Sequence, residues 1–223
     1  MKRLVVGDIH GCMVEFEELL ERAALSPEDE ILSLGDIVDR GPASPLVLEF
    51  FRNNPNARVL QGNHERKHSL CFEGKVRPAL SQVITRRQFG EEAYPAAVAF
   101  MESFPLFMRL PEAVLVHAFL EPGMPLEDQK EIVLVGTMHG KRHMVLTHDR
   151  PWYELYDGDK PLVVGHHDYQ GTGKPFIYRD RVFCIDTSCC HGKSLTGLVL
   201  PDFRLISVKS RKDYWRELKC LFP

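Results

Sequence analysis

Five short segments of the sequence combine residue types that bind divalent metal ions. They are Gly7-Asp8-Ile9-His10-Gly11, Gly35-Asp36-Ile37-Val38-Asp39-Arg40-Gly41, Gly62-Asn63-His64-Glu65, Val116-His117-Ala118 and Gly165-His166. Carboxylate, imidazole and amide oxygen without thiolate suit Mn, Fe or Zn. One such segment recurs by chance, but five in succession predict a metal centre.

Each of these segments follows a short apolar run of the kind that forms a buried strand. The runs cover residues 4–6, 31–34, 58–60, 113–116 and 162–164. Apolar spacing predicts helices over residues 14–25 and 44–52, so the chain opens as βαβαβ. This order indicates a largely parallel sheet, whose ligands bind beyond the carboxyl ends of the strands.

The middle and the end of the chain are patterned differently. Residues 66–111 are expected to be mostly helical and irregular, as a cap-like segment. Its basic residues Lys75, Arg77, Arg86 and Arg87 either form a solvated surface or help to hold an anionic substrate. Two hairpins are predicted, at 176–185 and 195–208. With no repeat or linker, we expect one domain over residues 1–223.

Composition excludes several classes of protein. With 44% hydrophobic and 26% charged residues, the chain is typical of a globular domain. No apolar run approaches the roughly 18 residues that span a bilayer, and no signal peptide is recognisable. The net charge of −3 gives no reason to expect a membrane or nucleic-acid partner. Six cysteines without a C-x-x-C pair favour a reduced, cytoplasmic protein, with a Cys189-Cys190 disulfide as the alternative.

The first three motifs resemble the signature of the calcineurin-like metallophosphoesterases, in the branch of the PPP-type serine/threonine phosphatases. The resemblance runs from residue 4 to about residue 208. The segment that begins at Ile185-Asp186-Thr187 resembles the closing motif of small bacterial and phage-like members. These include symmetrical diadenosine tetraphosphate hydrolases and the phosphatase module of polynucleotide kinase-phosphatases. The resemblance implies an α/β fold, the four-layer αββα sandwich of two mixed sheets.

The resemblance also implies a ligand set for two divalent ions. Mn²⁺ is the expected metal, and Fe and Zn remain alternatives. The chemistry of the residues agrees, since a ligand shared by two cations should be a carboxylate. Asp8 and His10 would bind the first ion, Asp36 would bridge, and Asn63, His117 and His166 would bind the second.

Catalytic roles follow from the same resemblance. His64 would be the general acid or would stabilise the leaving group, held by Asp39, and Arg40 would bind phosphate oxygens. Arginine suits bidentate phosphate binding better than lysine. A second phosphate-binding arginine is expected to be Arg150, with Arg142 as the alternative. Glu65 would support neighbouring ligands. Asp186 would lie near the site or act structurally, and His68, His139, His143 and His148 have no matching motif.

The substrate is less determined than the metal core, because the sequence departs from the family beside the ligands. Phe119 follows His117-Ala118, and His167-Asp168 stands where many relatives have Thr-Pro. Phosphoprotein hydrolysis is the leading expectation. The alternatives are symmetrical cleavage of dinucleoside tetraphosphates, with Phe119, Trp152 and Tyr169 as candidate base contacts, and cleavage at nucleotide or RNA ends. A scaffold that binds without catalysis is disfavoured, because it would not need Asp39, Arg40 and His64 together.

Overall fold

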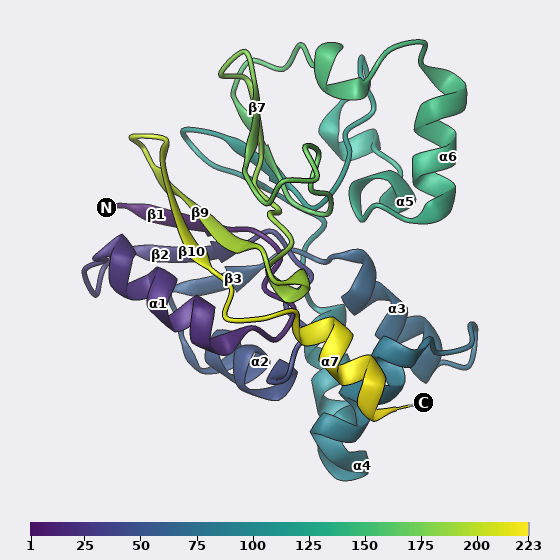
Figure 1. The fold of residues 1–223 in the computed structure, drawn as a ribbon. Coiled ribbons are helices and arrows are strands. Elements are labelled where there is room, and N and C mark those ends of the chain that lie inside the picture. Colours follow the sequence, from purple (N-terminus) through teal and green to yellow (C-terminus); the bar gives the residue numbers. More distant parts are fainter. Residues whose placement is uncertain (223) are drawn as a thin grey trace.

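Two mixed sheets of five strands each form the centre of the molecule (Figure 1). The computed structural model describes residues 1–222. The first sheet has the order β10-β9-β1-β2-β3. Its strands are β1 (Arg3–Val6), β2 (Glu30–Ser33), β3 (Ala57–Val59), β9 (Ser194–Leu200) and β10 (Arg204–Lys209). β1, β2 and β3 are parallel, and the hairpin β9–β10 joins β1 in antiparallel orientation.

The second sheet has the order β4-β5-β6-β8-β7. Its strands are β4 (Phe107–Arg109), β5 (Val114–Val116), β6 (Leu162–Val164), β7 (Phe176–Tyr178) and β8 (Val182–Cys184). β5, β6 and β8 are parallel, while β4 and β7 pair antiparallel at the two edges. Both predicted hairpins are therefore confirmed.

Alternating side chains explain why the two sheets stack face to face. Along β6, Val163 points into the core between the sheets, whereas Leu162 and Val164 point into a separate outer core. β1 alternates in the same way, with Val5 between the sheets. Both faces of these strands are thus apolar, as in strands buried on both sides. The outer face of each sheet must therefore be covered by a further layer.

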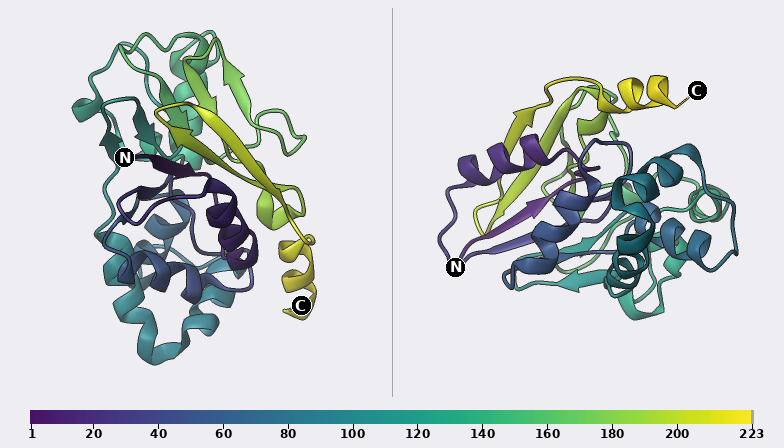
Figure 2. Two further views of the ribbon diagram at one scale, coloured as in Figure 1. Left: turned by 90° about the vertical axis from the view of Figure 1, so that its left-hand side faces the viewer. Right: turned by 90° about the horizontal axis from the view of Figure 1, so that it is seen from below.

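Helices supply the two outer layers (Figure 2). α1 (Met13–Ala23) and α2 (Ser44–Asn53) cover the first sheet, and the short α5 (Glu131–Leu134) and α6 (Met138–Thr147) cover the second. Short 3-10 turns occur at Leu126–Asp128, Trp152–Glu154 and Cys189–His191. The predicted four-layer αββα sandwich is confirmed.

The segment at residues 66–111 is mostly helical, as expected. It includes most of α3 (Asn63–Phe72) and all of α4 (Leu80–Glu102). These helices pack against each other, and α4 bends at Gly90, where φ is 75°. The segment also contains β4, which the sequence reading missed. That strand has three residues and pairs only at a sheet edge, so its local signal is weak. The C-terminal α7 (Tyr214–Leu221) was not predicted either.

The parallel strands of both sheets converge at one end of the sandwich. Asp8, Asp36 and Asn63 follow β1, β2 and β3 of the first sheet. His117, His166 and Asp186 follow β5, β6 and β8 of the second. Six strands thus deliver six polar side chains to a common edge.

Candidate metal centre

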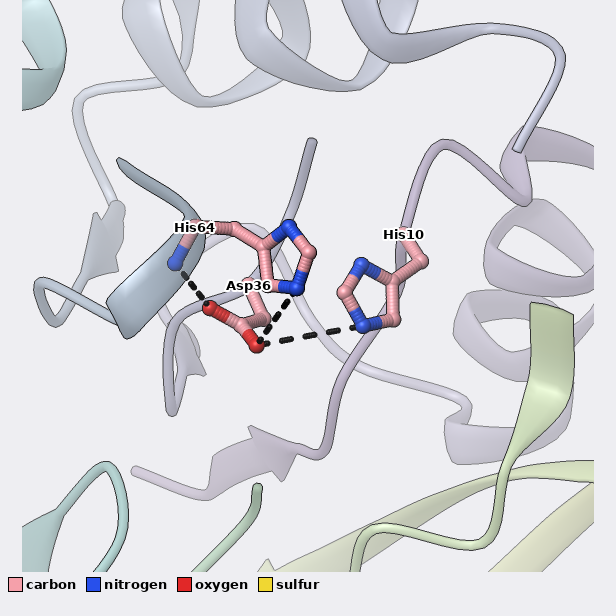
Figure 3. Close-up of side chains that lie close together, drawn as sticks. All are labelled: His10, Asp36 and His64. Atoms are coloured by element: carbon pink, nitrogen blue, oxygen red, sulfur yellow. Dashed lines mark hydrogen bonds and ion pairs between the residues drawn. The ribbon is translucent and has the colours of Figure 1, made fainter. Parts of the chain in front are cut away.

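Asp36 lies at the middle of the polar side chains that the two sheets bring together. Potential ligand atoms of His10, Asp36 and His64 all lie within 4.8 Å of one another (Figure 3). A second group, Asp36, His117 and His166, satisfies the same limit. Since Asp36 belongs to both groups, its carboxylate is placed to contact two ions at once.

The Asp36 carboxylate faces three imidazoles. Its Oδ2 atom lies 3.8 Å from Nε2 of His10 and 3.5 Å from Nε2 of His117. Nε2 of His64 is 4.0 Å away. Oδ1 accepts a hydrogen bond of 3.0 Å from the backbone N–H of His64, which leaves Oδ2 directed into the space among the rings.

The rings of His10 and His117 are each oriented by a hydrogen bond at Nδ1. Nδ1 of His10 lies 2.8 Å from the carbonyl oxygen of Val38, and Nδ1 of His117 lies 2.9 Å from that of Leu34. A carbonyl oxygen only accepts, so each Nδ1 carries the proton. Nε2 is then the nitrogen available to a metal ion, in the arrangement that metal-binding histidines commonly adopt.

Asn63, His166 and Asp8 complete the group of expected ligands. Oδ1 of Asn63 is 2.9 Å from Nδ1 of His166 and 3.3 Å from Nε2 of His117. Asp8 lies beside the two groups rather than within them: its Oδ1 accepts a hydrogen bond of 2.9 Å from the backbone N–H of His166. A Cβ on Gly165 would lie 2.2 Å from that oxygen, so the close approach requires glycine there.

The electrostatics of the site favour a cation. Burial and the neighbouring Asp186 raise the pKa of Asp8 well above its usual range. Burial also raises the pKa of Asp186 to about 6, with a further contribution from Asp36. Burial would lower the pKa of His117, but Asp36 raises it to about 10. Burial and the neighbouring carboxylates thus disfavour the ionised forms of Asp8 and Asp186. A bound cation would favour those ionised forms.

The donor set therefore fits two divalent ions. It offers carboxylates, imidazoles and an amide oxygen, and no thiolate belongs to either group around Asp36. Such donors suit hard to borderline metals. The residues able to hold these ions are Asp8, His10, Asp36, Asn63, His117 and His166.

Glu65 braces the loop that carries Asp36. Its Oε2 accepts hydrogen bonds from the backbone N–H groups of Asp36 (2.8 Å) and Gly62 (3.1 Å). Its Oε1 accepts hydrogen bonds from those of Ile37 (2.9 Å) and Val38 (3.3 Å). Glu65 is fully buried. It thus ties the first turn of α3 to the loop after β2 without facing the imidazoles itself.

His64 is held from behind by Asp39. Nδ1 of His64 is 2.6 Å from Oδ2 of Asp39. His68 and Gln82 also contact this carboxylate, and neither was singled out as a functional residue from the sequence. For His68 a signal existed, since it follows His64 by four residues and such pairs share one face of a helix.

Of the expected phosphate-binding arginines, the structure brings one to the site. Nη1 of Arg40 lies 3.2 Å from Nε2 of His10. Arg150 and Arg142 are exposed, and neither makes a hydrogen bond or ion pair with a site residue in the part of the chain described. A role for either in phosphate binding stays a prediction. Lys141 on α6 approaches His167, whose pKa is lowered by burial and by that lysine.

The candidate base contacts Phe119 and Trp152 lie inside the outer core of the second sheet. Each is only 7% exposed, and their ring centroids are 6.3 Å apart. The centroid of the Phe119 ring lies 5.4 Å from that of His166, so Phe119 packs against an expected ligand. Both rings are thus buried among core side chains, and a base contact by Phe119, Trp152 or Tyr169 stays a prediction.

All six cysteines are free, so the alternative of a Cys189-Cys190 disulfide is wrong. Cys12 and Cys189 lie close to Glu15 in a buried group outside the Asp36 centre.

Comparison with known proteins gives a consistent result. Residues 1–185 match the model of the calcineurin-like phosphoesterases. The chain is 30% identical to the asymmetrical bis(5′-nucleosyl)-tetraphosphatase PrpE of Bacillus cereus (strain B4264), over 97% of this chain and 98% of that protein. It is 33% identical to the symmetrical bis(5′-nucleosyl)-tetraphosphatase of Shewanella baltica (strain OS155), over 59% of this chain and 49% of that protein. A solved structure assigned as a diadenosine tetraphosphatase superposes with a TM-score of 0.78 at 24% identity, covering 94% and 93% of the two chains.

Within residues 1–222, none of the helices combines the length and the apolar character needed to cross a bilayer.

Proposed function

The chain belongs to the calcineurin-like phosphoesterase family, and from this premise we propose that it cleaves bis(5′-nucleosyl) tetraphosphates asymmetrically at a dinuclear metal centre. The observation that carries the substrate class is the end-to-end likeness to an asymmetrical tetraphosphatase, over 97% of this chain and 98% of the relative. The symmetrical relative is matched over only 49% of its length.

The proposed roles of the residues follow their geometry. Asp36 would contact both ions, because it alone belongs to both ligand groups. Asp8 and His10 would hold one ion, and Asn63, His117 and His166 would hold the other. When bound, a pair of such ions supplies a water-derived nucleophile at neutral pH and neutralises phosphoryl oxygens.

The remaining side chains act on the substrate. Arg40 reaches the centre beside His10 and binds phosphoryl oxygens as a fork of two N–H donors. His64, oriented by Asp39, holds the proton for the departing oxygen. The proposed second phosphate contact, Arg150, would have to approach when substrate binds, and Glu65 and Asp186 act as supports.

Hydrolysis of phosphoserine or phosphothreonine in proteins is the second candidate. Its support is the complete set of three motifs, which ends in Gly62-Asn63-His64-Glu65. Because the metal core serves both reactions, side chains around Asp36 do not discriminate between them. A direct comparison of substrates does.

The test is a product-resolved assay with added Mn²⁺. Diadenosine tetraphosphate, a phosphothreonine peptide and a nucleoside 2′,3′-cyclic phosphate are offered to one preparation, with Asp36→Asn prepared in parallel to exclude a contaminating phosphatase. We expect kcat/KM for diadenosine tetraphosphate to lead by about tenfold or more, which is about 1.4 kcal/mol. The products should be AMP and ATP.

Other outcomes overturn specific parts of the proposal. Release of ADP alone would make the cleavage symmetrical. A lead for the peptide would make the protein a phosphoprotein phosphatase, and a lead for the cyclic phosphate would move the substrate to nucleotide or RNA ends.

A further inference from the structure

His68 is a buried histidine directly behind His64. It lies one helical turn further along α3 and is completely excluded from solvent. Its Nε2 atom is 2.9 Å from Oδ1 of Asp39, and its Nδ1 atom is 2.8 Å from the hydroxyl oxygen of Tyr94 on α4. Both ring nitrogens therefore have partners.

The carboxylate of Asp39 accepts hydrogen bonds from side chains on both α3 and α4. Its Oδ2 accepts from Nδ1 of His64 at 2.6 Å and from the amide of Gln82. Its Oδ1 accepts from His68. Its backbone N–H donates to the hydroxyl of Ser44 at 3.1 Å. Asp39 is itself fully buried, so every one of these partners replaces a lost water.

The direction of the hydrogen bonds follows from the carboxylate. Burial would raise the pKa of Asp39, but His68 and His64 hold it well below the usual range, so the group is ionised and only accepts. His64 must then donate through Nδ1, and His68 through Nε2. The other nitrogen of His68, Nδ1, lies 2.8 Å from the hydroxyl oxygen of Tyr94. A continuous line runs from Tyr94 through His68 and Asp39 to His64.

We propose that His68, supported by Tyr94, is a positioning residue that fixes Asp39 and thereby the ring of His64. The inference rests on the proposed function, because it assumes that His64 holds the proton for the leaving group. Gln82 restrains one oxygen of Asp39, and His68 restrains the other. With both oxygens restrained, the carboxylate cannot rotate, and the ring of His64 keeps its Nε2 directed at the Asp36 centre, 4.0 Å from Oδ2.

A kinetic signature separates positioning from a merely structural role. Loss of proton donation slows an ester with a poor leaving group more than one with a good leaving group. We compare phenyl phosphate with 4-nitrophenyl phosphate for His64→Asn, His68→Phe, His68→Gln and Tyr94→Phe. These generic esters test the line of residues whichever physiological substrate the enzyme has.

The expected result has three parts. His68→Phe lowers kcat on phenyl phosphate about tenfold or more and on 4-nitrophenyl phosphate by less than about threefold, which is a weaker form of the His64→Asn pattern. His68→Gln, which keeps an N–H at similar reach, returns most of the loss. Tyr94→Phe gives a smaller loss of the same kind, because it removes only the support of His68.

Tyr214→Phe is the matched control. Tyr214 is a buried tyrosine whose hydroxyl donates to Glu15 at 2.9 Å, outside the line to His64. We expect it to leave the ratio of the two rates unchanged. An equal loss on both esters in His68→Phe would overturn the inference, as would an unchanged rate on both. If His64→Asn itself lost both esters equally, the assumed role of His64 would fail and the inference with it.

A spectroscopic readout keeps the inference testable in a protein that turns over no ester. Imidazole N–H protons bound to a buried carboxylate resonate far downfield in proton NMR, and we expect two such signals, from His64 and His68. His68→Phe should remove one signal and shift the other. A His64 signal that does not move would show that Asp39 is fixed without His68 and would overturn the inference.

Discussion

At the scale of single residues, Asp36 and His117 form a close, buried pair of opposite charge. Oδ2 of Asp36 and Nε2 of His117 lie 3.5 Å apart, and both side chains are buried. Despite burial, Asp36 raises the pKa of His117 to about 10. Without metal, this ring is therefore protonated on both nitrogens and positively charged at neutral pH. The imidazolium occupies the position where a metal would bring positive charge.

Metal binding should therefore expel a proton from His117. A ligand must present a lone pair, so the proton leaves at any pH below about 10. His10 and His166 release no proton on metal binding near neutral pH, because burial lowers the pKa of both. We expect the wild type to release about one more proton per chain than His117→Asn at pH 8. Calorimetry in buffers of different ionisation enthalpy measures this release.

The difference should disappear as the pH rises through about 10, where His117 is already deprotonated. Equal proton release by the two proteins at pH 8 would show that His117 binds metal without losing a proton.

At the scale of elements, the loop after β2 is held in an unfavourable backbone conformation. Asp36, Asp39 and Arg40 have φ values of 50°, 70° and 62°, in the left-handed region that favours glycine. Such residues cost about 1–3 kcal/mol each and persist only when their surroundings impose them. Here Glu65, at the start of α3, accepts hydrogen bonds from three backbone N–H groups of this loop and from that of Gly62.

Glu65→Gln should therefore destabilise the protein although it preserves the shape of the side chain. One acceptor oxygen becomes an NH₂ group that faces N–H donors, and the buried donors lose their partner. We expect a loss of about 2–4 kcal/mol in the free energy of unfolding, measured by urea denaturation.

Glu92→Gln on α4 makes the same chemical change at an exposed position and serves as the control. It should stay within about 0.5 kcal/mol of the wild type. A Glu65→Gln protein as stable as this control would mean that Glu65 does not hold the loop.

The elements differ in how far the sequence could predict them. The strands that precede Asp8, Asp36, Asn63, His117 and His166 were predictable, because each is an apolar run with its polar residue at most three positions further on. The contacts of Gln82 and Tyr94 were not, since they depend on how α4 packs against α3. Nor was the position of Arg150, which follows a short helix with a weak pattern. Local signals predict strands, whereas packing partners come from the tertiary fold.

At the scale of the whole molecule, neither sheet contains the centre by itself. Asp8, Asp36 and Asn63 come from the first sheet, and His117 and His166 come from the second. The sheets are also joined here by the hydrogen bonds from His166 to Asp8 and from His117 to Leu34. A metal bound at this edge therefore links the two halves of the sandwich.

Removal of metal should lower thermal stability. A ligand at 100 times its Kd stabilises the native state by about 2.7 kcal/mol, and for a protein of this size each kcal/mol shifts Tm by about 2–4 °C. We expect a Tm about 5–10 °C lower in chelator than in saturating Mn²⁺. Asp36→Asn should show a smaller metal-dependent shift. A Tm that chelator does not change would argue against a link between the sheets.

Whether Asp36 joins two ions can be measured directly by loading metal-free protein with Mn²⁺, counting bound metal and recording the EPR spectrum. A carboxylate shared by two ions predicts about two Mn²⁺ per chain with an exchange-coupled signal. In Asp36→Asn, the coupling should be lost and kcat should fall by about a hundredfold or more. A single ion per chain at saturation, or two ions with independent signals in the wild type, would contradict the bridged centre.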